Sequence, residues 1–203
     1  MRVERLIIGS TNPGKVKEWT GFLGELLPIV SISEIGNFPE PQETGATFEE
    51  NARIKARHYA RLTGEYVFSE DGGYEVDALD GEPGVKSRRI LPGGKDGTDQ
   101  ELIHYVLERL RGVPLEKRTV KLSFVAALSD PKGKIIFVEA NSFQGLVTEK
   151  PGPILTPGYP FRSIHLIPEL GKTYAELTEE EHARLSHKRP VARRLEKFLL
   201  EYK

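Results

Sequence analysis

Three acidic residues and one lysine that could form a site fall within residues 43–71 of this 203-residue chain. Glu43 precedes a segment with helical spacing, and Glu70 and Asp71 follow a short β-type run over residues 66–69. Lys55 shares the apolar stripe of the predicted helix, so its ammonium group points either to water or to an anion. Carboxylates at a strand end beside such a lysine are what a Mg²⁺–phosphate site requires. A solvated acidic loop with an outward lysine is the alternative, and this stretch alone leaves both open.

The helix that positions Lys55 has a clear start and a clear end in the sequence. Thr47, with Glu50 three residues later, fits a capping box, and Gly64 ends the pattern. Asn51 lies one turn before Lys55. Apolar side chains recur at helical spacing at Phe48, Ala52, Ala56, Tyr59 and Ala60.

A second candidate anion site follows the apolar run Leu6–Ile8. The loop Ser10, Thr11, Asn12, Pro13, Gly14 and Lys15 leads into a predicted helix over 16–27. Free backbone N–H groups and the helix dipole favour an anion at such a place, and Lys15 adds a positive charge. The loop nearly matches a P-loop, but Val16 stands where that motif needs Ser or Thr for Mg²⁺. An ordinary strand-to-helix turn is the alternative.

Two further segments have side chains suited to a nucleotide. His187, Lys188 and Arg189 form a cationic cluster at the start of the last predicted helix, where positive charge opposes the helix dipole. We interpret the cluster as an anion site, the alternative being a charged helix start that faces water. Tyr159 lies in a loop rich in Pro and Gly, where an aromatic ring either stacks on a base or fills the core.

The remaining pattern predicts an irregular segment over 31–46, then helices and strands that alternate. Capping boxes begin helices at Thr98 and Thr178. Residues 74–79 read as a strand or a short helical turn. A hairpin is predicted from the β-type runs 119–128 and 135–140. We expect residues 143–147 to extend the same sheet.

Composition argues against several classes of protein. The 29 basic and 30 acidic residues give a net charge of −1, which argues against a dedicated nucleic-acid binder. Cysteine is absent, so there is no disulfide framework and no Cys-based zinc site. No apolar run approaches the roughly 20 residues of a membrane helix, and the N-terminal run is too short for a signal sequence. We expect a cytoplasmic protein with one domain over 1–203, in one or two lobes.

Several of these stretches together resemble the inosine triphosphate pyrophosphatase family, which hydrolyses non-standard purine nucleoside triphosphates. The loop over 10–15 is similar to the family's T/S-x-N-x-x-K motif, and 43–56 is similar to E-x-G-x-T-F-x-E-N-A-x-x-K-A. Residues 70–73 and 83–89 resemble D/E-D-S-G-L…P-G-V-x-S-x-R. Residues 172–176 and 186–187 match K-T-x-A-E and the start of S-H-R. The five motifs occur in the family's order and span nearly the whole chain.

The resemblance implies a mixed α/β fold with a long central sheet flanked by helices, and two lobes with a nucleotide cleft between them. It also implies a homodimer, Mg²⁺, and cleavage between the α- and β-phosphates. By position, Asp71 would be general base and metal ligand, and Glu43 a second ligand. The loop over 10–15 and Lys55 would hold the triphosphate, and Gly72 would be a further substrate-binding residue. Gly158, Tyr159 and Pro160 would contact the base, with His182, His187 and Lys188 beside it. Glu70, Arg89 and Lys172 are further candidates from the matched motifs.

Four positions depart from the family's pattern. Gly72 replaces a serine, Pro160 stands where the base loop has Asp, His182 replaces a lysine and Lys188 replaces an arginine. We assign these departures to the side that holds the base, whereas the metal and triphosphate residues are intact. Altered base preference, or a non-catalytic nucleotide sensor, are therefore the alternative functions.

Overall fold

The computed structural model describes residues 3–202 as a chain of alternating strands and helices. The strands are β1 (Leu6–Ile8), β2 (Ile29–Ser31), β3 (Val67–Val76), β4 (Thr119–Ser129), β5 (Ile135–Val147), β6 (His165–Ile167) and β7 (Lys172–Thr173). The α-helices are α1 (Pro13–Leu23), α2 (Ile32–Ile35), α3 (Phe48–Thr63), α4 (Asp99–Arg109), α5 (Glu179–Leu185) and α6 (Arg189–Glu201). Short 3₁₀ segments are η1 (Asp77–Leu79), η2 (Gly84–Arg89), η3 (Leu115–Lys117), η4 (Pro160–Ser163) and η5 (Tyr174–Glu176).

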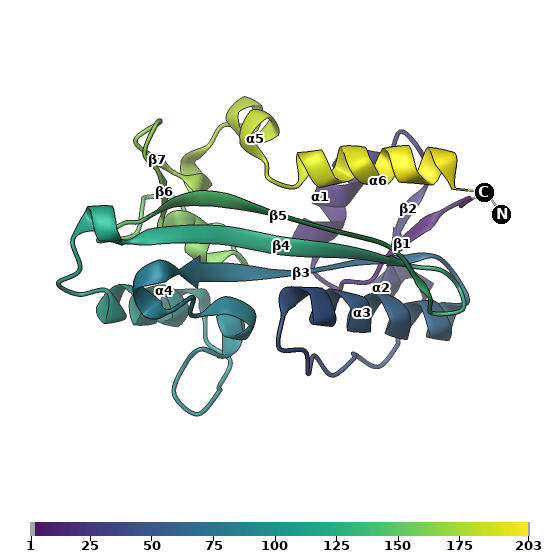
Figure 1. Ribbon diagram of the computed structural model, residues 1–203, viewed down its shortest axis with the longest axis horizontal. Helices are drawn as coiled ribbons and strands as arrows, with labels where there is room; N and C mark the ends of the chain where they lie inside the picture. Colours follow the sequence, from purple (N-terminus) through teal and green to yellow (C-terminus); the bar gives the residue numbers. More distant parts are fainter. Residues whose placement is uncertain (1–2, 203) are drawn as a thin grey trace. The chain divides into compact units, whose positions relative to one another are not determined.

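The strands form one mixed sheet in the order β2-β1-β3-β4-β5-β6-β7. β1 pairs in parallel with β2 and β3, whereas β6 pairs antiparallel with β5 and β7. The predicted mixed α/β fold with a long central sheet is therefore confirmed (Figure 1).

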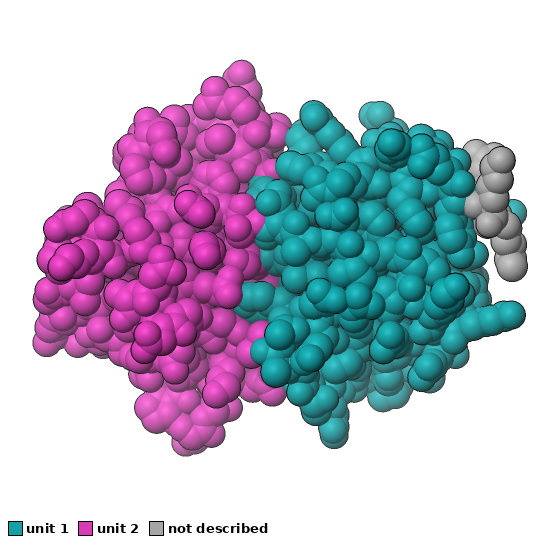
Figure 2. All heavy atoms as spheres, in the orientation of Figure 1, with its two compact units in different colours: residues 1–71, 124–141, 187–203 teal, residues 72–123, 142–186 magenta. Residues whose placement is uncertain are grey.

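The chain forms two compact units (Figure 2). Unit 1 contains Met1–Asp71, Phe124–Asn141 and His187–Lys203, and unit 2 contains Gly72–Ser123 and Ser142–Ser186. The boundaries between the two units fall inside β3, β4 and β5, so each of these strands contributes residues to both units.

Unit 1 has an apolar core on each face of its strands. On one face, Trp19 and Leu23 of α1 and Leu195 of α6 pack with Phe68 of β3 and Phe124 of β4. On the other face, α2 and α3 pack against β1 and β3 through Ile7, Ile32, Tyr59, Ala60 and Val67. Figure 1 shows α1 and α6 on one side of these strands and α3 on the other.

Unit 2 has a separate core around α4. Leu102, Ile103 and Val106 of this helix pack with Tyr74 of β3 and Phe161 of η4. The predicted capping box at Thr98 is confirmed, because its hydroxyl accepts from the N–H of Glu101 and the Glu101 carboxylate accepts from the N–H of Thr98.

The structure corrects three predictions of local structure. Residues 31–46 are not wholly irregular, because they include the end of β2 and the short helix α2. The first helix spans Pro13–Leu23 rather than 16–27, because Asn12 caps it and proline fits its first turn. The strand predicted to end at residue 69 continues to Val76. The predicted extension of the sheet by 143–147 is confirmed, because this run continues the strand 135–140.

None of the helices in the described part of the chain, residues 3–202, is long and apolar enough to cross a membrane.

Candidate active site

Glu70 and Asp71 lie in the middle of β3, not at its end as predicted. Both side chains are largely buried, with 5% and 9% of their residue surfaces exposed. Successive side chains of a strand point to opposite faces of the sheet. Accordingly, Glu70 contacts α1 and the start of α6, whereas Asp71 contacts α3. The two acids therefore form two neighbouring charged clusters rather than one acidic pair.

On the α3 face, Lys55 bridges two carboxylates. Its Nζ lies 2.8 Å from Oδ1 of Asp71 and 3.3 Å from Oε1 of Glu43. Burial disfavours the charged form of Lys55, but the carboxylates of Asp71 and Glu43 outweigh this and raise its pKa. Of the two predicted orientations of Lys55, the structure has the one toward an anion.

The loop that carries Glu43 is fastened to the start of α3. The N–H of Gly45 donates to Oδ1 of Asn51 at 2.8 Å, and the N–H of Ala46 donates to Oε2 of Glu50 at 2.6 Å. A Cβ on Gly45 would lie only 2.6 Å from Oδ1 of Asn51, so glycine permits the close approach. The capping box predicted at Thr47 is thus half formed: Thr47 caps the N–H of Glu50, but Glu50 bonds to Ala46 instead.

On the other face, Glu70 has three buried or half-buried partners. Its Oε2 accepts from the indole N–H of Trp19 at 2.8 Å, and its Oε1 lies 2.8 Å from Nζ of Lys188 and 3.5 Å from Nζ of Lys15. Burial opposes ionisation of Glu70, but the two lysines and the indole hold its pKa well below the usual range.

Lys188 is the N-cap residue of α6 and only 4% of its surface is exposed. Its Nζ contacts Oε2 of Glu18 at 2.8 Å as well as Glu70. Two carboxylates of the chain itself therefore compensate the charge of Lys188, and the alternative in which this lysine faces water is wrong. Binding of a substrate anion at this helix start stays a prediction. The neighbouring His187 is buried against the ring of Phe124.

The loop over 10–15 forms the predicted strand-to-helix turn. Oδ1 of Asn12 accepts from the N–H groups of Gly14 and Lys15, and Oγ of Ser10 accepts from the N–H of Asn12. Pro13 begins α1, and Thr11 is exposed. Burial lowers the pKa of Lys15; Glu70 opposes this, and the positive charges of Lys55 and Lys188 add to it.

The donor set of this region fits a divalent cation that also binds a phosphate. Within residues 3–202, no three His, Asp or Glu side chains are grouped closely enough to hold a metal by themselves. Asp71 and Glu43 do approach one cation together, the Lys55 ammonium group. Mg²⁺ commonly uses one or two carboxylates with water and substrate phosphates for its other ligands. The two carboxylates therefore suit a metal that arrives with substrate.

The other predicted site residues belong to unit 2. Gly158 has a φ of 79°, and its N–H donates to Oδ2 of Asp99 at 2.7 Å. The guanidinium of Arg162 stacks over the ring of Tyr159 at 3.9 Å. Pro160 is buried in η4, and Gly72 is exposed in β3.

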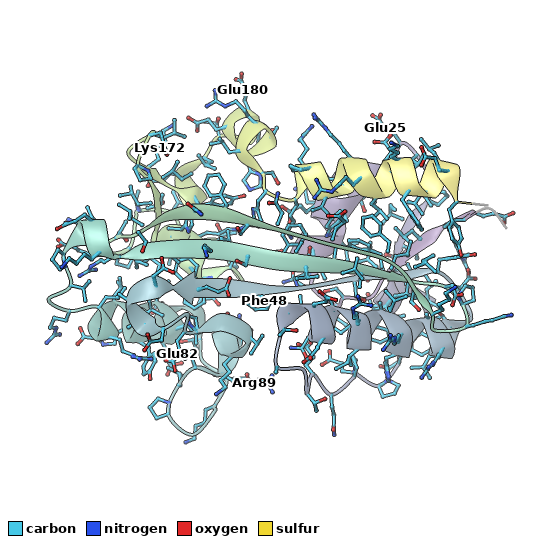
Figure 3. All side chains as sticks on the ribbon, viewed as in Figure 1. Glu25, Phe48, Glu82, Arg89, Lys172 and Glu180 are labelled. Carbon is cyan, nitrogen blue, oxygen red and sulfur yellow. The ribbon has the colours of Figure 1, made fainter. Side chains whose placement is uncertain are left out.

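The last three candidates of unit 2 have different surroundings. Nζ of Lys172 pairs with Oε1 of Glu181 at 2.7 Å. His182 packs against the ring of Tyr174. Arg89 is exposed and projects from η2 (Figure 3).

Sequence reasoning overlooked three contacts of these charged residues. Asn51 contacts Asp71, Trp19 contacts Glu70, and Glu18 contacts Lys188. Signals existed for the first two: Asn51 lies four residues before Lys55 and so shares its helix face, and a buried indole N–H requires an acceptor.

Comparison with known proteins agrees with the predicted resemblance. The model of the Ham1 family matches residues 6–198. A protein named dITP/XTP pyrophosphatase from Exiguobacterium sibiricum is 37% identical over 199 residues, 98% of each chain. One of the same name from Bacillus subtilis is 36% identical over 198 residues, 97% of this chain and 98% of the other.

Solved structures give the same result. A HAM1 protein from Coxiella burnetii has a TM-score of 0.84 and 31% identity, covering 99% of this chain and 100% of the other. The Ham1 protein of Staphylococcus aureus has a TM-score of 0.82 and 31% identity, covering 98% and 100%. The chain therefore belongs to the Ham1 family.

Proposed function

We propose that this protein is a nucleoside triphosphate pyrophosphatase that hydrolyses dITP, ITP and XTP to the monophosphate and pyrophosphate, and so removes non-standard purine nucleotides. Relatives of nearly equal length that are named dITP/XTP pyrophosphatase support this activity. The observation in the structure that carries it is the contact of Asp71 with Lys55, which joins a candidate base to a candidate phosphate ligand.

The charges of unit 1 support a requirement for a divalent metal, which we propose is Mg²⁺. Three lysines (Lys15, Lys55 and Lys188) meet four carboxylates (Glu18, Glu43, Glu70 and Asp71) through close contacts. The group has one excess negative charge and would repel a polyanionic triphosphate. Mg²⁺ held by Asp71 and Glu43 would reverse this balance and offset charge on the phosphates.

The residues of unit 1 then have distinct roles in the reaction. Asp71 accepts a proton from the water that attacks the α-phosphorus. As the new P–O bond forms, the bond from this phosphorus to the oxygen bridging the α- and β-phosphates breaks, and pyrophosphate leaves with that oxygen. Lys55 and Lys15 stabilise the charge that gathers on the leaving group. The side chain of Asn12 already accepts from the N–H groups of Gly14 and Lys15, so α1 contributes to the same phosphates through its dipole.

Base recognition is assigned to Tyr159 with its loop neighbours Gly158 and Pro160, and to His182, His187 and Lys188. A second candidate function is the same hydrolysis with a different base preference. It is favoured by the side chain at position 188, because the Lys188 ammonium group is buried between Glu18 and Glu70.

The family resemblance supports three further proposals. The protein forms a homodimer, works in the cytoplasm, and uses residues 1–203 as one functional domain. Continuity of β3, β4 and β5 through both units supports the last of these. Light scattering after size-exclusion chromatography tests the dimer, since a monomer mass would contradict it.

The proposed activity is tested by pyrophosphate release across a panel with Mg²⁺: ITP, dITP, XTP, the standard NTPs and dNTPs, and modified pyrimidine triphosphates. We expect preference for ITP, dITP and XTP, and loss of release when EDTA removes the metal. Preference for another nucleotide would favour the second candidate. Tight binding of nucleotides without any release would instead indicate a sensor.

A further inference from the structure

We propose that Asn51 is a positioning residue that fixes Asp71 and Glu43 relative to each other; this inference rests on the proposed pyrophosphatase function. Asn51 is buried, with 1% of its surface exposed, and lies on α3 between the two acids that the reaction uses. Its amide hydrogen-bonds both to Asp71 and to the backbone of the loop that carries Glu43.

The oxygen and the nitrogen of the Asn51 amide bond to different groups. Oδ1 accepts from the N–H of Gly45 at 2.8 Å, two residues after Glu43. That backbone group is a donor, so the amide oxygen must face it, and the NH₂ group is then directed to the other side. Nδ2 donates to Oδ2 of Asp71 at 3.3 Å, while Lys55 contacts Oδ1 of the same carboxylate at 2.8 Å.

This division leaves the Asp71 carboxylate with a fixed orientation. Lys55 holds one oxygen and Asn51 the other, so the plane of the carboxylate cannot rotate without loss of a buried hydrogen bond. A side chain that orients the residue that binds or reacts affects activity by about 10- to 100-fold in comparable sites. Asparagine suits the position because it supplies one acceptor and one donor without a charge.

Charged groups around Asp71 determine what a change at position 51 does. Lys55 faces it from α3, Glu43 contacts the same lysine from the preceding loop, and Lys15 interacts with it from α1. A carboxylate at position 51 would repel the Asp71 carboxylate instead of donating a hydrogen bond to it. Asn51→Asp therefore keeps the acceptor for Gly45 and the size of the side chain, but replaces the donor to Asp71 with a negative charge.

The first experiment measures kcat and KM for dITP hydrolysis, together with the melting temperature, in the unaltered protein and in N51D. We expect kcat of N51D to fall at least tenfold while KM changes less than threefold, because Asp71 is misoriented but the lysines proposed to hold the triphosphate remain. A purely structural role would lower the melting temperature without this separation of kcat from KM.

A second variant tests the other end of the amide. In Gly45→Ala, the new Cβ would lie 2.6 Å from Oδ1 of Asn51 and push the Glu43 loop away. We expect G45A to need about tenfold more Mg²⁺ for half-maximal activity, while its kcat at saturating Mg²⁺ stays within threefold of the unaltered value. Arg53→Ala, which removes only the surface pair with Glu49 on the same helix, is the matched control and should behave like the unaltered protein.

The outcomes separate this inference from the function on which it rests. Inactivity of both the unaltered protein and R53A would overturn the pyrophosphatase function, and the inference with it. Activity in these two, with kcat of N51D within threefold of the unaltered value and an unchanged Mg²⁺ requirement in G45A, would overturn the inference alone. If N51D fails to fold, G45A decides: an unchanged Mg²⁺ requirement would then contradict the proposal.

Discussion

The two units bury polar side chains in opposite ways. Around Glu70 and Asp71, unit 1 brings together lysines and carboxylates that neutralise one another. Unit 2 buries Arg118 and His165, which have 5% and 0% of their surfaces exposed. Arg118 donates three hydrogen bonds to the carbonyl oxygens of Leu110, Val113 and Thr148. His165 packs among the rings of Tyr74, Phe143 and Tyr174.

The difference separates groups that can exchange partners from groups that cannot. A lysine paired with a carboxylate can turn to a phosphate, while the carboxylate turns to a metal, and both charges remain compensated. A guanidinium bonded to backbone carbonyls has no alternative partner that keeps those carbonyls satisfied. We therefore expect changes in the charged clusters of unit 1 to affect activity most, and changes at Arg118 and His165 to affect stability.

Lys55→Ala should give the largest effect, because it removes the cation beside Asp71 and a proposed phosphate ligand. We expect kcat/KM for dITP to fall about 10²–10³-fold, as for loss of one preorganised charge-stabilising group. The measurement is steady-state pyrophosphate release. The matched control is Lys17→Ala, an exposed lysine on α1, and a similar loss there would show that general surface charge is responsible.

Arg118→Met should reduce stability rather than catalysis. Three buried carbonyls lose their donor, and we expect the free energy of unfolding to fall by roughly 3 kcal/mol, measured by urea denaturation. Arg111→Met is the control, because the Arg111 side chain is 76% exposed and forms a surface ion pair with Glu108, three residues earlier. Equal losses in both variants would contradict the structural role assigned to Arg118.

His165→Phe should change how stability depends on pH. Burial lowers the pKa of His165 from 6.5 to about 4, with the backbone of Gln144 opposing the shift. The unfolded chain takes up a proton below about pH 6.5 while the folded chain stays neutral, so folding loses stability as pH falls from 6.5 to 4.

This loss of stability in acid can be measured by comparing the two proteins at pH 7 and pH 5. At pH 5 the unaltered protein should be about 2 kcal/mol less stable, relative to pH 7, because of this group alone. Phenylalanine does not titrate, so thermal melts of H165F should show a smaller drop between pH 7 and pH 5. An identical drop in both proteins would rule out His165 as the source.

Trp19→Phe tests the smallest effect in unit 1. The change removes the indole donor to Glu70 but leaves both lysines in place. We expect stability to fall by about 1.5 kcal/mol, the typical contribution of a hydrogen bond to a charged group. Because Lys15 and Lys188 still compensate Glu70, kcat/KM should change less than threefold, and a loss as large as that of K55A would contradict the separation of the two clusters.

The sequence predicted the parts of this site that depend on local pattern. The inward position of Lys55 follows from the apolar stripe of α3, and a strand-to-helix loop over 10–15 was predicted, although the start of α1 at Pro13 was not. The extent of β3 was not predicted, since two acids followed by two glycines have the composition of a turn. Pairing in the sheet, rather than local preference, keeps Glu70 and Asp71 within the strand.

Long-range compensation of charge also lay outside the reach of the sequence. Glu70 is separated from Lys188 by 118 positions and from Trp19 by 51. The sequence indicated that the cationic start of α6 requires an anion, but not that the chain supplies it. Likewise, Asn51 was recognisable as a neighbour of Lys55, but its bond to Asp71 depends on the packing of α3 against β3.

The central claim is that Asp71 is the general base of a metal-dependent pyrophosphatase. The most direct test compares pyrophosphate release from dITP by the unaltered protein and by Asp71→Asn, with Mg²⁺ present and with circular dichroism to confirm the fold. Asparagine keeps an acceptor for Lys55 but cannot take a proton at neutral pH. We predict release by the unaltered protein and at least a 10³-fold lower rate in D71N with an unchanged fold. Turnover by D71N within tenfold of the unaltered rate would contradict the account.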